Sequence, residues 1–427
     1  MTEKNRTQKW METKGRMNRA IGTYAHLTRF IPKGPRQKVR DWLIDKTSIQ
    51  PVEPPKPYRK GKFPYGINEY GFFREENGLG QGARMYARSI EAAGIPHRFI
   101  HLNFLTWMPQ NETSFDGKLD PKPAYAVNLI HLNPDQWEEA MRNYPKGSFD
   151  RHYNIGIWLW ELETLPRGWL KYLDYVDELW VPSEFIAGAA RKETAKPVTV
   201  IPYGMEVTKA ERTRADFDLP EETFIALSMY DSNSYVHRKN PMAAIEAFTE
   251  AFAGNSNAML IVKINHPKEA ETAQIEDQLK KAGVQYRLIQ ERMEREELNA
   301  LIACCDAFIS LHRSEGFGLP IAEAMALGTP AVATNWSANA EFMSAEGACR
   351  VGYTLVPVGD RYKDAEAGQV WAEPDIHEAA GYLTKLYEDP GYREGVRLAG
   401  QAHVRTTLSI EKSGKMMKKR LDEILCK

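Results

Sequence analysis

Residues 314–330 constrain the fold more strongly than any other part of this chain of 427 residues. They follow residues 307–311, an apolar run that is typical of a buried parallel strand. Glycines interrupt the beginning of the segment, Pro320 suits the first position of a helix, and Gly328 indicates where that helix ends. The sequence therefore predicts a strand, a glycine loop and a helix of about eight residues that begins near Leu319.

The start of this helix is a candidate anion site. Free N–H groups and positive dipole charge at a helix N-terminus bind phosphate. Glu315 lies in the loop beside this end, and Glu323 lies one turn inside the helix. Glycine lets backbone N–H groups approach a ligand closely. The candidate ligand-binding residues of the loop are Gly316, Phe317, Gly318 and Leu319. Two carboxylates beside an anion site suit a sugar phosphate, whose hydroxyls would bind the acids.

The segment resembles the E-x(7)-E signature of retaining glycosyltransferases with the GT-B fold, in particular those of family 4, which build bacterial surface polysaccharides and glycolipids. The resemblance implies that Glu315 contacts the hydroxyls of the donor sugar and that Glu323 contacts the ribose of the nucleotide. The alternative is an ordinary strand, loop and helix with two solvated glutamates. The residues between and after the two acids favour the resemblance.

Apolar runs alternate with helical patterns along the rest of the chain, which predicts an α/β fold with parallel sheets and right-handed crossovers. The predicted strands cover residues 65–72, 98–104, 125–132, 154–160, 178–183, 198–202, 224–230, 260–265, 286–289, 307–311 and 330–334. The resemblance implies two facing Rossmann-like domains with a cleft between them. We expect a basic arm with a proline-rich linker (1–62), an acceptor domain (63–208), a donor domain (209–408) and a last helix (409–427) that crosses back onto the first domain.

The charge of the chain is distributed unevenly. The whole chain has 56 basic and 57 acidic residues, whereas residues 1–62 hold 16 Lys and Arg against 5 Asp and Glu. The remainder therefore holds 40 basic and 52 acidic residues. A basic arm on an acidic body indicates an anionic partner, and aromatic residues between the bases favour a membrane surface. Nucleic acid is a weaker alternative because the body is acidic, and an arm packed on its own body is another.

The cysteines and the apolar runs indicate in which cellular compartment the chain is found. Its cysteines, Cys304, Cys305, Cys349 and Cys426, lack metal-ligand spacing, which fits a reducing cytosol. No signal peptide or membrane span is expected, so we predict a cytoplasmic protein, with peripheral attachment to the inner face of the plasma membrane as the open alternative. Asp216 and Asp218 form a D-x-D pattern in polar sequence and are expected to be solvated. We predict no metal site and no cofactor.

Three features of the first domain are candidates for chemistry. Gly80 and Gly82 lie in a predicted glycine-rich turn before a helix, and Arg84 is either part of that site or a solvated residue of the first turn. The turn resembles the glycine loop of family 4, which lets the donor diphosphate or the acceptor approach. His131 ends a strand, where such sheets place ligand groups, but a satisfied core histidine is an equal alternative. Glu161 follows an apolar run at the end of another strand, where an acid needs partners.

Basic residues of the second domain are the candidate diphosphate site. The Arg-Lys-Asn-Pro group at residues 238–241 resembles the basic element of family 4, which implies that Arg238 and Lys239 bind the donor diphosphate. The family pattern has an arginine where this chain has Ser234, so the division of labour between the two cations is open. Lys263 interrupts an apolar strand, and we expect its ammonium to meet a phosphate or an acid.

These features predict a retaining, metal-independent glycosyltransferase. Its donor would be a UDP- or GDP-linked sugar and its acceptor a glycan or a lipid-linked glycan in bacterial surface polysaccharide synthesis. The alternatives are a catalytically silent scaffold that binds nucleotide sugars, or a GT-B relative such as an epimerase or phosphorylase. We expect no partnership with nucleic acid.

Overall fold

The structure is a computed structural model that describes residues 52–104, 109–145, 147–208, 211–362 and 365–426. Residues 1–51 of the predicted basic arm lie outside the described residues. The chain divides into two compact units between residues 53 and 54, and the fold below is that of the second unit.

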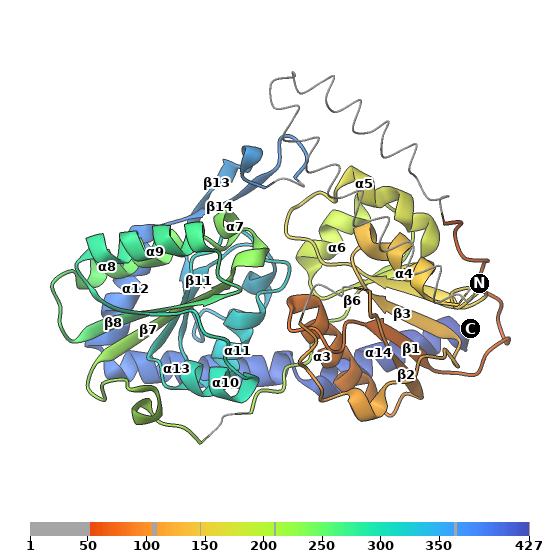
Figure 1. Ribbon diagram of the computed structural model, residues 1–427, viewed down its shortest axis with the longest axis horizontal. Coiled ribbons are helices and arrows are strands. Elements are labelled where there is room, and N and C mark those ends of the chain that lie inside the picture. Colours follow the sequence, from red (N-terminus) through yellow and green to blue (C-terminus); the bar gives the residue numbers. More distant parts are fainter. Residues whose placement is uncertain (1–51, 105–108, 146, 209–210, 363–364, 427) are drawn as a thin grey trace. The chain divides into compact units, whose positions relative to one another are not determined.

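The first half of this unit is built on a six-stranded sheet in which every neighbouring pair is parallel (Figure 1). Its strands have the spatial order β2-β1-β3-β4-β5-β6. They are β1 (Ile67–Gly71), β2 (His97–His101), β3 (Val127–His131), β4 (Tyr153–Ile157), β5 (Glu178–Val181) and β6 (Val198–Val200). The accompanying α-helices are α3 (Gly78–Ala92), α4 (Trp137–Asn143), α5 (Arg167–Leu170) and α6 (Glu184–Arg191). Ser183 caps α6 by accepting a hydrogen bond from the amide of Ile186.

The second half repeats this plan with a second six-stranded parallel sheet. Its strands have the spatial order β12-β11-β10-β7-β8-β9. They are β7 (Phe224–Asp231), β8 (Ala258–Asn265), β9 (Gln285–Ile289), β10 (Ala307–Ser310), β11 (Ala331–Thr334) and β12 (Cys349–Val351). Its helices are α7 (Val236–Lys239), α8 (Pro241–Phe252), α9 (Glu269–Ala282), α10 (Arg295–Ala303), α11 (Leu319–Leu327), α12 (Ile376–Glu388) and α13 (Pro390–Thr407). The predicted α/β architecture with two parallel sheets is confirmed.

The strands are apolar because helices cover both faces of each sheet. In β7 and β8 most residues are buried, as expected for parallel strands. Such strands read as continuous apolar runs, which is why the sequence identified them. The four cysteines of the described residues are free thiols.

The last helix, α14 (Ile410–Leu425), packs on the first half, beside α3 (Figure 1). Arg420 of α14 donates two hydrogen bonds to Glu178 of β5, from Nε at 2.9 Å and from Nη2 at 2.7 Å. The Ser413 hydroxyl donates to the carbonyl of Pro202. The last helix thus lies against the first half, although it follows the second half in the sequence.

The chain passes between the two halves twice, and the two passages touch. The amide of Met205 donates to the carbonyl of Leu408 at 2.6 Å, and Met205 and Ser409 form an isolated parallel bridge. The first passage leaves the first half after β6, and the second returns to it ahead of α14.

An antiparallel hairpin follows β12 and was not predicted. Its strands are β13 (Tyr353–Pro357) and β14 (Val370–Pro374). Every residue of β13 is exposed or half-buried, so the strand lacks the apolar run that marks the parallel strands. The connection between β13 and β14 packs against the first half of the unit.

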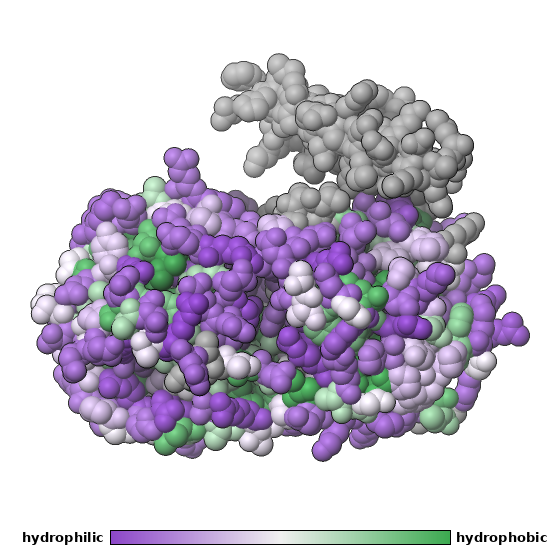
Figure 2. Space-filling model, turned by 60° about the horizontal axis from the view of Figure 1, so that its bottom comes forward, coloured by the Kyte–Doolittle hydropathy of each residue, from purple (hydrophilic) through white to green (hydrophobic). Residues whose placement is uncertain are grey.

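Hydrophilic side chains cover most of the surface visible in Figure 2, and hydrophobic ones form small separate groups. Among the described residues, the large hydrophobic side chains that are exposed are Tyr353, Leu355 and Leu398. No helix in the described ranges combines the length and the apolar composition needed to cross a membrane.

Candidate active site

The glycine loop and helix α11 form as the sequence predicted. β10 ends at Ser310, and α11 runs for nine residues from Leu319 to Leu327. Gly318 precedes the helix with a φ of 91°, a left-handed conformation that favours glycine. Pro320 occupies the second helical position and not the first, because Gly318 is the N-cap. The free amides of the first turn therefore lie directly after the loop that carries Glu315.

Glu315 is the centre of a buried ion-pair network. Its Oε1 lies 2.5 Å from the Lys239 ammonium, and its Oε2 lies 3.3 Å from Nη1 of Arg238. Only 7 % of Glu315 is exposed. Burial raises the pKa of this carboxyl, but Lys239 and Arg238 outweigh burial and lower it to about 2. Glu315 is therefore ionised at neutral pH.

Helix α7 brings the two cations to this carboxylate. Tyr235 and Asn240 flank α7 with positive φ angles of 56° and 52°, so the helix is a single short turn. The Asn240 amide donates to the carbonyl of Leu311, which anchors the end of the turn to the strand that leads to Glu315. Burial lowers the pKa of Lys239, and the charge of Glu315 opposes that shift.

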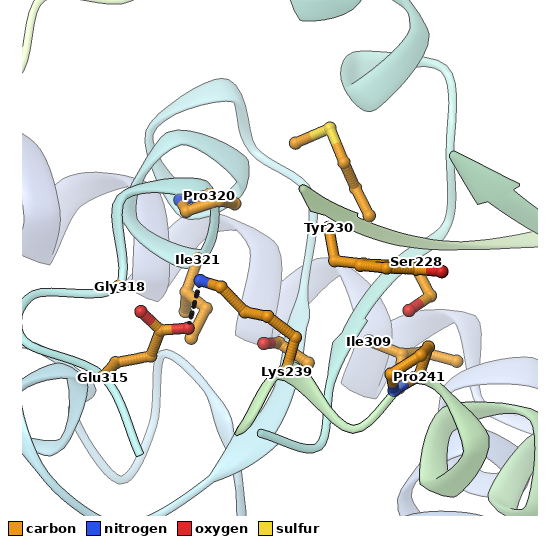
Figure 3. A pocket seen from close by; sticks show the side chains of 11 residues that line it. Ser228, Tyr230, Lys239, Pro241, Ile309, Glu315, Gly318, Pro320 and Ile321 are labelled. Atoms are coloured by element: carbon orange, nitrogen blue, oxygen red, sulfur yellow. Dashed lines mark hydrogen bonds and ion pairs between the residues drawn. The ribbon is translucent and has the colours of Figure 1, made fainter. Parts of the chain in front are cut away.

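These groups line one pocket between the ends of β7 and β10 and the start of α11 (Figure 3). The lining residues are Ser228, Met229, Tyr230, Lys239, Pro241, Ile309, Ser310, Glu315, Gly318, Pro320 and Ile321. In Figure 3, Lys239 and Glu315 point toward each other across the pocket. The pocket combines a cation, an acid and a helix N-terminus, which is the set of groups that a sugar phosphate needs.

Glu161 reaches this network from the first half of the unit. β4 ends at Ile157, so Glu161 lies in the loop beyond the strand. Its Oε1 lies 3.4 Å from Nη2 of Arg238, and its Oε2 accepts a hydrogen bond of 2.9 Å from the hydroxyl of Tyr362. Its backbone carbonyl accepts a hydrogen bond from the Ser314 hydroxyl. Burial lowers the pKa of Arg238, but Glu161 and Glu315 more than compensate and raise it.

Glu323 lies inside α11 and is not among the residues that line this pocket. Only 5 % of it is exposed, and its Oε1 forms an ion pair of 3.0 Å with Arg295 of α10. The predicted contact with a ribose would engage a carboxylate that Arg295 already orients. Arg292, in the loop between β9 and α10, forms an ion pair with Glu76 of the first half.

The predicted glycine turn in the first half is wrong in its local structure. Gly80 and Gly82 lie inside α3, which begins at Gly78 after the cap Asn77. A Cβ at Gly80 would lie 2.4 Å from the carbonyl oxygen of Glu75, and one at Gly82 would lie 2.5 Å from the Tyr203 hydroxyl. These glycines therefore admit close approach by the protein itself, and their contact with a ligand stays a prediction.

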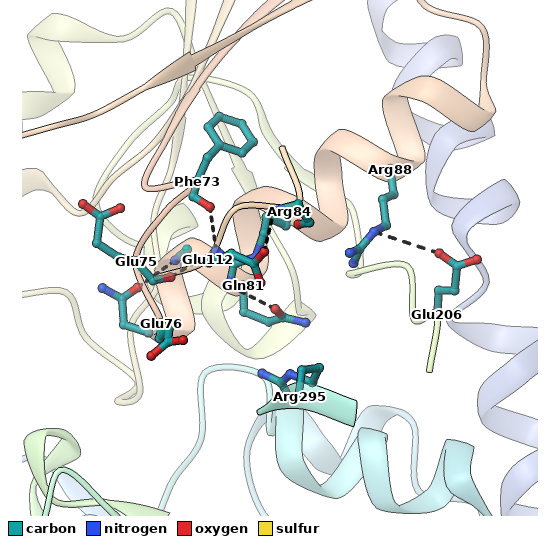
Figure 4. A network of polar contacts seen from close by, with 12 residues as sticks. Phe73, Glu75, Glu76, Gln81, Arg84, Arg88, Glu112, Glu206 and Arg295 are labelled. Atoms are coloured by element: carbon teal, nitrogen blue, oxygen red, sulfur yellow. Dashed lines mark hydrogen bonds and ion pairs between the residues drawn. The ribbon is translucent and has the colours of Figure 1, made fainter. Parts of the chain in front are cut away.

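Arg84 is buried, so its interpretation as a solvated residue is wrong. Its guanidinium donates to the carbonyls of Phe73 and Glu75 and is only 3 % exposed. Figure 4 shows it holding the loop before α3, with Arg295 of α10 facing the same region. Burial lowers the pKa of Arg84 to about 10, and burial also raises the pKa of Glu75 to about 7.

His131 ends β3 as predicted but does not line the pocket. It is fully buried, and its Nε2 lies 2.9 Å from the Tyr203 hydroxyl. The Tyr203 ring in turn packs edge-on against Phe317 of the glycine loop, at 5.0 Å between ring centroids. Burial lowers the pKa of His131 to about 3, so the imidazole is neutral. Its catalytic role stays a prediction.

Lys263 is buried, but its ammonium bonds the side-chain oxygen of Asn265 at 2.7 Å and the carbonyl of Ile264, not a carboxylate. The predicted acid partner is therefore replaced by neutral oxygens, and the phosphate contact stays a prediction. Asp216 and Asp218 do not pair: Asp216 completes a capping box with Thr213. Among the described residues, no group of His, Cys, Asp and Glu side chains is placed to hold a metal ion.

Three site residues escaped sequence reasoning. The Ser337 hydroxyl accepts a hydrogen bond of 2.8 Å from the amide of Glu315, and His312 is fully buried near the same carboxylate. Tyr362 comes from the unpredicted hairpin connection. Single Ser, His and Tyr residues outside a motif carry no sequence signal.

A family model and a curated protein each match part of this chain. Residues 210–403 match the family model of "Glycosyl transferases group 1". Alpha-monoglucosyldiacylglycerol synthase of Streptococcus pneumoniae is 25 % identical over 221 residues, which are 48 % of this chain and 46 % of that protein. The match thus spans less than half the length of this relative.

Solved structures match most of the chain. HepE of Anabaena, in complex with UDP and glucose, has a TM-score of 0.59 at 13 % identity over 84 % of this chain and 100 % of that one. A glycosyltransferase of Rickettsia africae has a TM-score of 0.61 at 13 % identity over 85 % and 99 %. Sucrose-phosphate synthase of Thermosynechococcus elongatus has a TM-score of 0.59 at 15 % identity over 84 % and 99 %. The fold is GT-B, as predicted.

Proposed function

We propose that this chain is a retaining glycosyltransferase that moves a sugar from a nucleotide-diphosphate sugar to a glycan or lipid-linked acceptor. The observation that carries the proposal is the convergence of Glu315, Lys239 and Arg238 beside the N-terminus of α11. The family match covers all of these residues. A cationic site next to an acid is what a donor with a charged diphosphate and a neutral sugar requires.

In this proposal the second half of the unit stabilises the leaving group. Breaking the bond between sugar and diphosphate builds negative charge on the phosphate. Lys239, Arg238 and the free amides of α11 face that charge, and preorganised donors of this kind supply a large part of catalysis. Glu315 would exchange its ion pair with Lys239 for hydroxyls of the donor sugar. Glu323, oriented by Arg295, would take the ribose.

The first half would complete the site from the other side. Glu161 meets Arg238 across the two halves and is placed to orient the acceptor or the sugar. We propose attack on the same face of the sugar as departure, with the leaving phosphate accepting the proton of the acceptor. Closure of the two halves would exclude water and so limit hydrolysis of the donor. Gly80, Gly82, His131 and Lys263 are supporting residues of the proposed site.

Similar proteins favour UDP and a lipid-linked acceptor. HepE is described in complex with UDP and glucose and with UDP-glucose, and the curated relative is named as the synthase of a glycolipid. We therefore propose a UDP-linked hexose as donor before a GDP-linked one. The acceptor would belong to the synthesis of bacterial surface polysaccharide or glycolipid.

Calorimetric titration with UDP, GDP and their common sugar conjugates tests the donor site. One nucleotide should bind the wild-type protein at micromolar level, and Glu323→Ala should weaken binding by about tenfold, the loss expected for a charged hydrogen bond. Glu388→Ala, at an exposed helix end, is the matched control and should bind as the wild type does. Absence of binding for every nucleotide would refute the donor assignment.

Product analysis separates the remaining possibilities. Incubation with the bound donor and acceptor candidates, followed by NMR of the anomeric carbon, should show transfer with retention, both with and without a chelator. Binding without turnover would indicate a scaffold. An altered sugar that stays on the nucleotide would indicate an epimerase.

We propose that the enzyme works at the cytoplasmic face of the membrane, to which the basic residues 1–62 would attach it. Sedimentation with anionic vesicles should retain the protein at low salt and release it at high salt, because exposed charges are screened. Equal retention on neutral vesicles would contradict this attachment. Filter binding to nucleic acid, measured against salt concentration, tests the alternative that the basic residues bind nucleic acid.

A further inference from the structure

The connection between β13 and β14 joins the two halves of the unit beside the candidate site. Gln369 accepts a hydrogen bond of 3.2 Å from the amide of Thr164, and Glu366 accepts one of 2.8 Å from the amide of Arg167. Apolar side chains of both halves share one buried cluster there, including Trp158, Trp160, Leu162, Val358, Tyr362 and Trp371. The hairpin therefore follows the second half in the sequence, but its connection contacts both halves.

Tyr362 lies where this connection meets the candidate site. It is 5 % exposed, and its hydroxyl donates to Oε2 of Glu161 at 2.9 Å. Its ring lies 5.6 Å from the ring of Trp160 and meets the ring of Tyr235 edge-on at 4.5 Å. One side chain thus contacts a carboxylate of the first half and the residue directly before α7 in the second half.

The contact with Glu161 extends to the proposed diphosphate site. Tyr362 holds Oε2 of Glu161 while Oε1 faces Nη2 of Arg238 at 3.4 Å. Nη1 of Arg238 donates to the carbonyl of Ser314 at 2.9 Å. Arg238 is 4 % exposed, and its Nε has no hydrogen-bond partner among the described atoms. A free buried donor on a fixed guanidinium is suited to an incoming phosphate oxygen.

The contact with Tyr235 supports the backbone that carries both cations. Tyr235 has a φ of 56° and a ψ of 99°, a conformation that is rare for a bulky residue and needs support from its surroundings. The amides of Arg238 and Lys239 both donate to the carbonyl of Tyr235, at 3.0 and 3.2 Å. A change in the backbone of Tyr235 would therefore displace both cations together.

We propose that Tyr362 is a positioning residue of the glycosyl transfer reaction. It orients Glu161 with its hydroxyl and braces Tyr235 with its ring, and through them it fixes Arg238 and Lys239 for the leaving diphosphate. The inference rests on the proposed function. It also makes the hairpin connection the element that couples contact between the two halves to the geometry of the donor site.

Kinetics of Tyr362→Phe test the role of the hydroxyl. The variant keeps the ring, and we expect kcat to fall about tenfold, the size of one buried hydrogen bond to a charged group, while KM for the donor stays within about twofold. In a Glu161→Ala background the same substitution should change kcat by less than about twofold, because its partner is gone. Tyr353→Phe on the exposed strand of the same hairpin is the control and should match the wild type. An unchanged kcat in Tyr362→Phe, or additive losses in the double variant, would overturn the proposal.

Hydrogen exchange tests the role of the ring without requiring turnover. In Tyr362→Ala the amides of residues 235–240 should exchange about tenfold faster than in the wild type, whereas those of Tyr353→Ala should not change. Unchanged exchange at these amides in Tyr362→Ala would refute the bracing role whether or not the protein transfers sugar. If the wild-type protein transfers no sugar but exchange responds as expected, the proposed function fails and the structural positioning stands.

Discussion

Replacing Arg420 of α14, the cation that pairs with Glu178 of β5, should strongly lower the free energy of unfolding of the unit. Glu178 is fully buried, and Arg420 gives it two hydrogen bonds of 2.9 and 2.7 Å while keeping 23 % of its side chain exposed. Breaking a buried ion pair by removing one partner costs about 3–5 kcal/mol. Three neutral donors remain on the carboxylate in Arg420→Met, from Tyr153, Trp180 and Thr199. We therefore expect the lower end, about 3 kcal/mol.

Equilibrium unfolding in urea, followed by tryptophan fluorescence, measures this loss. Lys419→Met changes the exposed neighbour of Arg420 and should cost less than about 0.5 kcal/mol. Replacing Glu178 by Gln in the Arg420→Met protein should recover about 1–2 kcal/mol, because the uncompensated charge is then gone. The reasoning is refuted if Arg420→Met lies within about 1 kcal/mol of Lys419→Met, or if Glu178→Gln adds a further loss to Arg420→Met.

Three further predictions address the site and its support. Lys239→Met should lower the transfer rate about 10²- to 10³-fold, because a preorganised charge is lost. Lys281→Met, at an exposed position of α9, is the control and should leave the rate unchanged. A steady-state transfer assay measures both rates. The pKa of Glu75 is raised to about 7 in the folded state, so its contribution to stability is present below its unfolded pKa and is lost as pH rises to about 7. The stability of the wild type relative to Glu75→Gln, from urea unfolding, should therefore fall by about 2 kcal/mol between pH 5 and pH 8. Gly82→Ala should destabilise by about 1–3 kcal/mol because its Cβ would lie 2.5 Å from the Tyr203 hydroxyl, whereas Gly381→Ala in open space within α12 should stabilise slightly in thermal unfolding.

Each of these predictions has an outcome that contradicts it. Equal rates for the two lysine variants would remove Lys239 from the proposed mechanism. A pH-independent difference between wild type and Glu75→Gln would mean that this carboxyl titrates normally. Equal stability of the two glycine variants would mean that Tyr203 moves aside without cost.

Sequence reasoning identified the parts of the fold that have a strong local signal. The parallel strands are continuous apolar runs because they are buried on both faces, and α11 is bounded by Gly318 and Gly328, each with a positive φ. The pairing of Glu315 with Lys239 joins residues that are 76 positions apart. Sequence placed both in a donor site through the family resemblance, but their direct contact follows only from the position of α7 beside β10.

The errors arose where tertiary contacts decide the local structure. Gly80 and Gly82 belong to a glycine-rich stretch that is typical of a turn, but they lie in a helix. Without a Cβ at these positions, the carbonyl of Glu75 and the hydroxyl of Tyr203 can pack directly against that helix. Arg84 is charged, which favours a surface position. Its guanidinium instead donates hydrogen bonds to backbone carbonyls, and no local sequence pattern reveals these partners. The hairpin after β12 was missed because β13 is exposed and lacks an apolar run.

The two passages of the chain between the halves define how the halves can move. A single tether would let one half rotate and translate freely against the other, but the hydrogen bond between Met205 and Leu408 joins two passages side by side. We infer that the paired passages act as a hinge, about which the halves would swing more readily than they would slide past each other. Contacts remote from this hinge, such as Glu161 with Arg238, would break first if the halves swing apart.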